Sequence, residues 1–257
     1  MIQVYSAEQI HAALPWPKLM QALEAAFIEG ATVPVRHPHA LSSSDTLLLM
    51  PAWDRELILT KLVTVIPNAP HTVQATVVAL DRATGEPRAV MDGEAITLRR
   101  TAATSALAAI KLAQLPVKTL LVVGGGRLAA WMARAHIALV PGIERVVIWA
   151  RKIDAAQALV DTLTREPEHA HVKFSVATSL ETATRQANLI TCATTSTEPL
   201  IRGEWLQSGT HLDLVGGFKR NMREVDDEAV RRARVVADTY AGALAEAGDL
   251  VQPIERG

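Results

Sequence analysis

The chain has 257 residues, of which 49% are hydrophobic and 21% are charged, with a formal net charge of −1. This length and composition predict a sizeable folded core, organised as one large or two ordinary domains, and exclude a wholly disordered chain. The near-zero charge gives no support for nucleic acid or an anionic membrane as the main partner.

The N-terminal segment and the cysteine content indicate which cellular compartment, disulfides and metal sites to expect. The N-terminus lacks the basic and apolar regions of a signal peptide, and no apolar run approaches the ~20 residues that cross a bilayer. We therefore expect a cytoplasmic protein without a membrane partner. The single cysteine, Cys192, excludes an intrachain disulfide and a cysteine-based zinc cluster, and we predict no metal site.

Residues 1–115 have the pattern of an α+β domain. A helical segment at 7–29 is interrupted near its prolines and ends at Gly30. Four strand-like runs rich in Val, Ile, Leu and Thr follow, and we expect them to pair antiparallel. They lie at 47–51, 57–66, 74–80 and from residue 89 onward. An Ala-rich helix is expected from Thr101 to Leu115, and Pro116 then marks the domain boundary.

Strands and helices alternate in the second half of the chain, which predicts a parallel, doubly wound sheet. Helices are expected at about 127–139 and 153–165. The expected strands are at 119–123, 145–149, 172–176, 189–193, 211–215 and 235–237. The fold class is therefore α/β, with a Rossmann-type domain at 116–240 after the α+β domain at 1–115.

A glycine motif follows the first strand of this second half. The apolar run Leu120–Val123 precedes Gly124, Gly126 and Ala129, in G-x-G-x-x-A spacing, and a helix follows. This order suits the pyrophosphate of a dinucleotide, because the glycines allow a tight turn and close approach at a helix N-terminus. We expect Gly125, Arg127 and Leu128 of the same loop to contact the cofactor. The alternative is a glycine-rich turn in another kind of α/β protein.

The end of the next strand distinguishes between the two nicotinamide dinucleotides. A carboxylate at this point binds the ribose 2′-hydroxyl of NAD(H). Here the strand ends in Ala150, Arg151 and Lys152, and Arg151 can pair with a 2′-phosphate. NADP(H) is therefore favoured, whereas the nearby Asp154 keeps NAD(H) possible. In the alternative interpretation, the two cations are solvated loop charges.

The stretch from Val90 to Leu107 contains Asp92-Gly93, Arg100-Thr-Ala-Ala and Ser105-Ala. It resembles the ornithine cyclodeaminase/mu-crystallin family. Further matching pieces cover almost the whole chain in the same order. They are 34–36, 48–51, 61–65, Thr76, 193–199, 203–206 and 247–249.

The resemblance implies roles for individual residues. Arg100 would clamp the substrate carboxylate with help from Arg36, and Lys61 would lie beside the reacting nitrogen. Thr76 would line the same pocket. Thr101, at the start of a helix, would offer its hydroxyl and backbone N–H to the cofactor phosphates. Without the resemblance, Arg100 would be interpreted as a helix-start or surface charge and Lys61 as a solvent-facing residue.

Two further segments are expected to contact ligands. Ala193, Thr194 and Thr195 fall at the carboxyl end of a strand of the parallel sheet, where such folds bind ligands, and Val215 is at the end of the next strand. Phe218 occupies the place of an aspartate that cyclodeaminases carry after a Gly-Gly or Gly-Ala pair. A phenyl ring cannot accept a proton or bind an ammonium by charge, so Phe218 argues against cyclodeamination.

The resemblance therefore implies an NAD(P)H-dependent ketimine reductase. Its substrate would be Δ1-pyrroline-2-carboxylate or Δ1-piperideine-2-carboxylate, with Phe218 contacting this small cyclic imino acid. One alternative is an ornithine or lysine cyclodeaminase, or an amino-acid dehydrogenase of the same family. Another is a non-catalytic protein that binds the cofactor and a small ligand.

The resemblance also implies roles for the domains. Residues 1–115 would bind substrate and form a homodimer, residues 116–240 would bind NAD(P), and residues 241–257 would return toward the first domain. The apolar strands at 57–66 and 74–80 are the expected source of a sheet edge for dimerisation.

Overall fold

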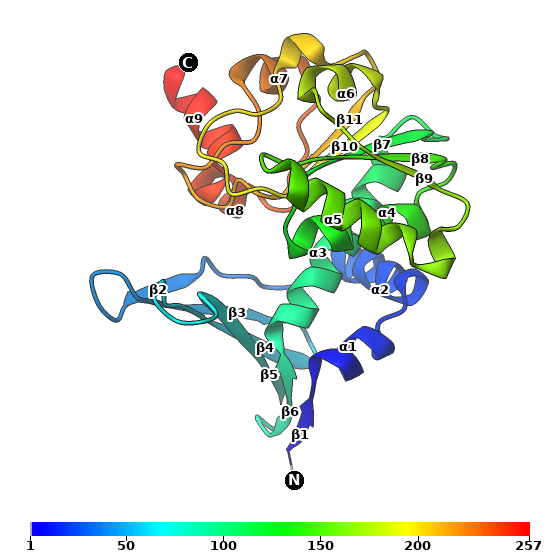
Figure 1. The fold of residues 1–257 in the computed structure, drawn as a ribbon. Coiled ribbons are helices and arrows are strands. Elements are labelled where there is room, and N and C mark those ends of the chain that lie inside the picture. Colours follow the sequence, from blue (N-terminus) through cyan, green and yellow to red (C-terminus); the bar gives the residue numbers. More distant parts are fainter. Residues whose placement is uncertain (1) are drawn as a thin grey trace. The chain divides into compact units, whose positions relative to one another are not determined.

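The computed structural model describes residues 2–257 (Figure 1) and divides into two compact units. Unit 1 extends to Arg100, and unit 2 extends from Thr101 to Gly257. Within the described residues, no helix is both long and apolar enough to cross a membrane. The predicted roles of residues 1–115, 116–240 and 241–257 stay predictions.

Unit 1 contains a six-stranded sheet in the order β1-β6-β5-β4-β3-β2. Its strands are β1 (Gln3–Tyr5), β2 (His37–Ala40), β3 (Thr46–Trp53), β4 (Leu57–Val65), β5 (Val73–Asp81) and β6 (Pro87–Asp92). All neighbours pair antiparallel except β1, which runs parallel to β6. The α+β interpretation of this half is therefore confirmed, and β1 and β2 are strands that the sequence pattern did not predict.

The position of β4 and β5 in this sheet corrects one expectation. Both strands are interior, since β4 pairs with β3 and β5, and β5 also pairs with β6. Their backbone groups are already used by neighbours, so neither strand offers an edge for dimerisation. The edges belong to β1 and β2, which are short and largely exposed.

Two helices precede most of the sheet of unit 1. Helix α1 (Ala7–Ala13) begins with a capping box in which Ser6 and Gln9 bond each other's backbone N–H groups. Helix α2 (Trp16–Glu29) has a proline in its first turn and ends at Gly30, where φ is +77°. The expected interruption and end of the 7–29 segment are both confirmed.

Helix α3 (Gly93–Leu112) corrects the expected helix at 101–115. It begins eight residues earlier, because the Asp92 carboxylate accepts the backbone N–H of Ala95 at 2.7 Å and caps the first turn. The helix crosses the division between the units. Arg99, Arg100 and Thr101 therefore lie inside a helix and not at its start.

Unit 2 contains a five-stranded parallel sheet in the order β11-β10-β7-β8-β9. Its strands are β7 (Thr119–Val123), β8 (Arg145–Trp149), β9 (Lys173–Val176), β10 (Leu189–Cys192) and β11 (His211–Leu214). The doubly wound sheet is confirmed. The expected strand at 235–237 is wrong: this segment forms no strand, and Val235 and Val236 are half exposed, at 49% and 56%.

Helices cover both faces of this sheet (Figure 1). Helices α4 (Arg127–Leu139) and α5 (Ile153–Thr164) lie on one face. On the other, α6 (Leu180–Gln186) and α7 (Asp227–Arg232) share a buried cluster with Leu121 and Ile190. The chain ends in α8 (Tyr240–Glu246) and α9 (Gly248–Arg256).

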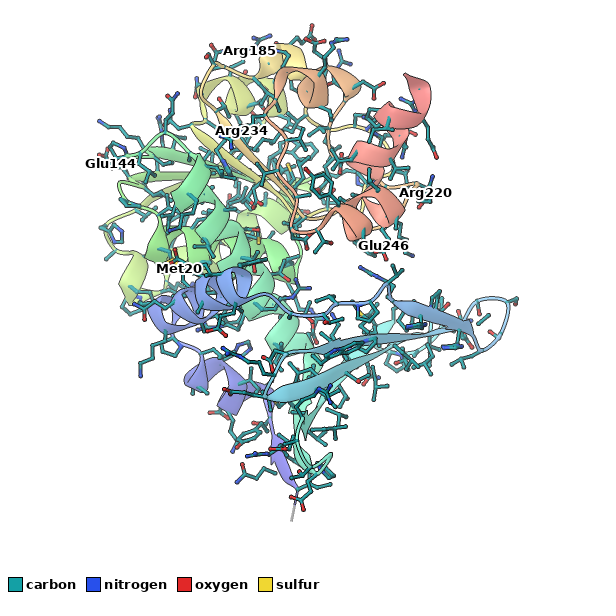
Figure 2. The ribbon with its side chains drawn as sticks, turned by 180° about the vertical axis from the view of Figure 1, so that it is seen from behind. Met20, Glu144, Arg185, Arg220, Arg234 and Glu246 are labelled. Atoms are coloured by element: carbon teal, nitrogen blue, oxygen red, sulfur yellow. The ribbon has the colours of Figure 1, made fainter. Side chains whose placement is uncertain are left out.

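The stability of unit 2 rests on its apolar core. All five residues of β7 are buried, as are all four of β10. Several ion pairs lie at its surface, such as Arg185 with Glu181 and Arg220 with Glu255. Figure 2 shows Arg185 and Arg220 on the outside of this unit. Exposed pairs of this kind contribute roughly 1 kcal/mol or less each, so burial of the strands dominates.

Candidate active site

A pocket of about 280 Å³ lies at the carboxyl ends of the strands of unit 2. We call it the sheet-end pocket. Its lining combines three segments, from the ends of β7, β8 and β10. The lining residues are Gly124, Gly125, Gly126, Trp149, Ala150, Arg151, Lys152, Ala155, Ala193, Thr194, Thr195, Ser196 and Leu200. Carboxyl ends of parallel strands are where doubly wound folds bind ligands.

The glycine loop, residues 124–126, gives this pocket its close backbone approach. Gly124 has φ +138°, and a Cβ there would lie 2.6 Å from the carbonyl oxygen of Ala193. A Cβ on Gly125 would meet the side chain of Ala155 at 2.9 Å. A Cβ on Gly126 would meet nothing within 4 Å, so its lack of a side chain leaves open space at the N-terminus of α4.

Most residues expected to bind a dinucleotide lie together in the sheet-end pocket. Arg151 and Lys152 are exposed on its rim, just after β8. Four expected residues, Thr101, Arg127, Leu128 and Val215, are not among its lining residues. Sequence reasoning missed four that are: Trp149, Ala155, Ser196 and Leu200. Trp149 and Ser196 adjoin expected residues, so the strand ends could have indicated them, whereas Ala155 and Leu200 adjoin none.

Thr101 needs a correction. It is the ninth residue of α3, so its backbone N–H belongs to the helical hydrogen-bond ladder and is not available to phosphates, as it would be at a helix start. Its hydroxyl is different. This oxygen is buried and has no hydrogen-bond partner within the described residues, so a ligand group could still satisfy it.

The cation group of unit 1 consists of Lys61, Arg100 and Arg36. Lys61 lies in the middle of β4, and its Nζ donates to the Thr97 hydroxyl on α3 at 3.5 Å. That hydroxyl itself donates to the carbonyl of Gly93 at 2.6 Å, so the lone pairs of the Thr97 oxygen are available to accept from the ammonium. Burial, followed by the positive charges of Arg100 and Arg36, lowers the pKa of Lys61 from 10.5 to about 8.

The adjacent arginines Arg99 and Arg100 differ in their surroundings. Arg99 is 7% exposed, and its guanidinium lies 4.0 Å from the ring centre of Trp16 on α2. This stacked arginine is part of the packing of unit 1. Arg100 is exposed and close enough to Lys61 to lower its pKa. The structure thus leaves Arg100 as the arginine of this pair that belongs to the cation group.

Thr76 does not join the cation group. In the antiparallel pairing of β4 and β5, Lys61 is opposite Val77, and Thr76 is opposite Leu62. Paired residues point to the same face and successive residues to opposite faces, so Thr76 and Lys61 lie on opposite faces of the sheet. The expectation that Thr76 lines the same pocket as Lys61 is therefore wrong.

Phe218 lies after β11, where its side chain is 46% exposed. It follows two glycines at which side chains would not fit. A Cβ on Gly216 would lie 2.2 Å from the Thr194 carbonyl oxygen, and one on Gly217 would lie 2.2 Å from Asp249 Oδ2. The Gly-Gly pair therefore allows close packing of this loop, and an exposed apolar ring follows it.

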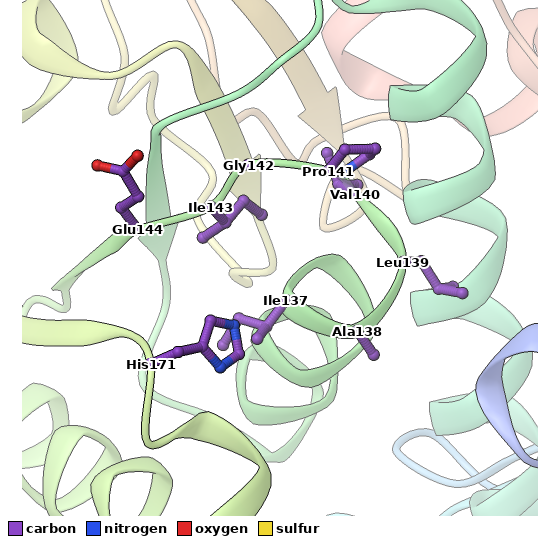
Figure 3. Close-up of a pocket in the computed structure, with 9 residues that line it drawn as sticks. All are labelled: Ile137, Ala138, Leu139, Val140, Pro141, Gly142, Ile143, Glu144 and His171. Carbon is purple, nitrogen blue, oxygen red and sulfur yellow. The ribbon is translucent and has the colours of Figure 1, made fainter.

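A second pocket, of about 390 Å³, lies at the other end of the sheet of unit 2 (Figure 3). It is formed by the end of α4 and the connection to β8. Its lining is mostly apolar, with Glu144 and His171 as its ionisable side chains. Among the described residues, no cluster of His, Cys, Asp or Glu is arranged to hold a metal ion.

The family model of the ornithine cyclodeaminase/mu-crystallin family matches residues 2–255. The chain belongs to this family. The resemblance that the Asp92-Gly93 and Arg100-Thr-Ala-Ala motifs indicated is therefore confirmed, and the match extends over both units.

Two curated proteins resemble this chain over most of its length. Protein SAR DEFICIENT 4 of Arabidopsis thaliana is 40% identical, over 88% of this chain and 72% of the relative. Delta(1)-pyrroline-2-carboxylate reductase of Colwellia psychrerythraea is 32% identical, over 98% of this chain and 82% of the relative.

A solved structure is also similar. It is Thermococcus litoralis Delta(1)-pyrroline-2-carboxylate reductase in complex with NADH and L-proline, with a TM-score of 0.91 and 28% identity. The alignment covers 100% of this chain and 81% of that one. The fold of this chain is thus similar to that of the reductase over the whole of its length.

Proposed function

We propose that this protein is an NAD(P)H-dependent ketimine reductase. It would reduce Δ1-pyrroline-2-carboxylate or Δ1-piperideine-2-carboxylate to the corresponding cyclic amino acid. The observation that carries the proposal is the cation group, in which a half-buried lysine with a pKa of about 8 lies near two arginines. Similarity to two Δ1-pyrroline-2-carboxylate reductases supports it.

The two arginines of the cation group suit the carboxylate of such a substrate. A guanidinium offers a planar fork of donors that a carboxylate accepts in a bidentate manner. We assign Arg100 as the main partner and Arg36, on the loop before β2, as the second. Once the carboxylate is held, the ring nitrogen and the carbon bonded to it have a fixed orientation.

Lys61 is the candidate proton donor. Its pKa of about 8 keeps the ammonium mostly protonated at neutral pH yet makes it a better acid than an ordinary lysine. Reduction of the C=N bond adds a hydride to carbon and leaves an amine nitrogen that needs a proton. Lys61 would hold or give that proton, and Thr97 would keep the ammonium oriented through its hydroxyl.

The sheet-end pocket fits the cofactor that supplies the hydride. The close approach at Gly124 and the open space at Gly126 are features that a dinucleotide would use. The unsatisfied hydroxyl of Thr101 lies outside the pocket lining and is a further candidate partner for the cofactor. When bound in its reduced form, the nicotinamide cofactor provides the hydride. Arg151 and Lys152 on the rim support a preference for NADP(H), through the additional phosphate of that cofactor.

Phe218 favours reduction over cyclodeamination. A cyclodeaminase needs a group that manages the substrate amine and a water molecule, and a phenyl ring offers neither charge nor a proton acceptor. Imine reduction needs no such base, and an exposed ring after the Gly-Gly pair suits contact with an apolar substrate ring.

One assay distinguishes the candidate activities. Purified protein is given NADPH with either cyclic imine, and oxidation of the cofactor is followed by absorbance. We expect turnover with at least one imine and no ammonia release from ornithine supplied with NAD⁺. Ammonia release without imine reduction would favour a cyclodeaminase. Tight NADPH binding without turnover of any imine or keto acid would favour a non-catalytic binding protein.

We also propose a homodimer formed through unit 1. Four of its apolar side chains, Val33, Val35, Leu41 and Val73, are 51% to 60% exposed. Exposed apolar groups of this kind favour association. Light scattering should give twice the mass of the chain, and Val35→Asp should give the single-chain mass. A monomeric unmodified protein would contradict the proposal.

A further inference from the structure

Glu224 is a buried carboxylate that connects the ends of two strands in unit 2. Its side chain is 0% exposed. One oxygen, Oε1, accepts the backbone N–H of Thr194 at 2.7 Å and the Thr194 hydroxyl at 2.8 Å. The other, Oε2, accepts the backbone N–H of Gly216 at 2.7 Å. The carboxylate thus holds the segments that follow β10 and β11.

One of these segments is a wall of the sheet-end pocket. Thr194 lines the pocket, and its neighbour Ala193 lies against the glycine loop, where its carbonyl oxygen would be 2.6 Å from a Cβ on Gly124. A shift of Thr194 would therefore change the space beside the glycine loop. Gly216 has no room for a side chain between Thr194 and Glu224, so the three backbone segments meet without an intervening group.

Glu224 is itself held from the far side. Asp249, at the start of α9, accepts the backbone N–H groups of Glu224 and Val225 at 2.8 and 3.0 Å. The backbone N–H of Arg223 donates to the carbonyl of Ser196, another lining residue, at 2.8 Å. The position of the carboxylate is therefore fixed relative to both the pocket wall and α9.

The three hydrogen bonds to Glu224 favour its ionised form. All of them bring a proton toward the carboxylate, so a proton added to either oxygen would leave a buried N–H without an acceptor or force the Thr194 hydroxyl to turn. Burial raises the pKa of Glu224 to about 7, and the charge of Asp249 adds to this effect against the hydrogen bonds that lower it.

The other ionisable groups around Glu224 have separate roles. Burial raises the pKa of the Cys192 thiol well above its usual range, so it stays neutral. Burial also raises the pKa of Asp249, and the positive charge of Arg223 offsets part of this rise. The Arg223 guanidinium pairs with Asp227 at 2.7 Å. Among these side chains, the Glu224 carboxylate is the one that bonds a lining residue of the pocket, Thr194.

We propose that Glu224 is a positioning residue for the cofactor: its carboxylate holds Thr194 and Gly216 in the arrangement that binds the dinucleotide, and proton uptake releases them. This inference rests on the proposed use of the sheet-end pocket for a nicotinamide cofactor. Binding should then weaken on acidification through the range around neutral pH, where the carboxylate gains its proton.

The test measures the Kd of NADH by its fluorescence at several pH values. NADH is the probe because the 2′-phosphate of NADPH titrates in the same range (pKa about 6). We expect the Kd of the unmodified protein to rise about tenfold between roughly pH 8 and pH 6. The reason is that pH 6 lies about one unit below the midpoint of the Glu224 titration, and the ionised fraction falls about tenfold per unit. Glu224→Gln should bind NADH more weakly at pH 8, with a flat pH profile. Glu144→Gln, the same change at the opposite end of the sheet, should match the unmodified protein.

Two results would overturn the proposal. One is a flat pH profile in the unmodified protein, which remains measurable even if Glu224→Gln does not fold. The other is a Glu224→Gln variant that keeps both the affinity and the pH dependence. The readout is cofactor binding alone, so it is independent of whether the protein reduces an imine. Failure of the reductase assay with pH-dependent NADH binding would leave the role of Glu224 intact.

Discussion

The cation group of unit 1 and the sheet-end pocket of unit 2 differ in the chemical groups that form them. The cation group consists of charged side chains from a loop, a strand and a helix that are distant in sequence. The sheet-end pocket consists largely of backbone and small side chains at the ends of neighbouring strands. A site of the first kind should be destroyed by removing a side chain, and one of the second kind by adding a Cβ. The following predictions test this difference, from the largest expected effect to the smallest.

The largest effect is expected for the arginine of the cation group. Arg100→Ala should lower kcat/KM for the cyclic imine about 10²- to 10³-fold, because it removes a charged partner of the substrate carboxylate. Arg88→Ala, which removes an exposed arginine paired with Asp81 elsewhere in unit 1, should leave kcat/KM unchanged. NADPH affinity should be the same in both. An Arg100→Ala variant with the same kcat/KM as the unmodified protein would show that other residues bind the substrate carboxylate.

Adding a Cβ should affect the glycine loop in two separable ways. Gly124→Ala should weaken cofactor binding and lower the free energy of unfolding by about 1–3 kcal/mol, because φ is +138° and the Ala193 oxygen is too close. Gly126→Ala should leave stability nearly unchanged, since nothing lies within 4 Å of the added Cβ. It should still weaken cofactor binding roughly tenfold, because the Cβ fills the space for the pyrophosphate. Thermal unfolding and fluorescence titration measure the two effects. Destabilisation by Gly126→Ala would contradict the distinction.

Lys61 links activity and stability to pH. With its pKa lowered from 10.5 to about 8, the folded state binds fewer protons than the unfolded chain between these values. Stability should therefore rise with pH through this window, and the charged lysine costs stability below it. Lys61→Met should raise the free energy of unfolding at pH 7 by about 1–3 kcal/mol while abolishing imine reduction.

The titration of Lys61 should also determine how kcat depends on pH. In the unmodified protein, kcat should fall above about pH 8 as the proton donor is lost. Denaturant unfolding and rate measurements over pH provide the checks. A Lys61→Met variant that is both less stable and still active would refute the assignment.

The smallest effect is expected at the rim of the sheet-end pocket. Arg151→Ala should raise the Kd of NADPH about tenfold and leave the Kd of NADH unchanged, because an exposed arginine interacts with the 2′-phosphate in high dielectric. Arg165→Ala, which changes an exposed arginine at the C-terminal end of α5, serves as the control. If both Kd values change equally, Arg151 contacts a part common to the two cofactors.

Much of unit 2 could be predicted from sequence because its signals are local. The order strand, glycine loop, helix lies within about twenty residues, and the bounds of β7, α4 and β8 agree with the expected ones. The errors came where a local signal was weak or was misjudged. Residues 235–237 have strand composition but no neighbouring strand to pair with, and the cap at Asp92 was not used to place the start of α3.

The sequence by itself determined the family, the alternation of strands and helices in unit 2, and the identity of the lysine and arginines in unit 1. Periodicity, turn residues and short motifs suffice for these, because each depends on neighbours along the chain. The tertiary structure alone decided that Thr76 and Lys61 lie on opposite faces, that Arg99 packs on Trp16, and that burial lowers the pKa of Lys61. It also revealed Glu224, whose bonds to Thr194 span thirty positions in sequence. Register, burial and pKa are set by groups that meet only when distant segments pack together.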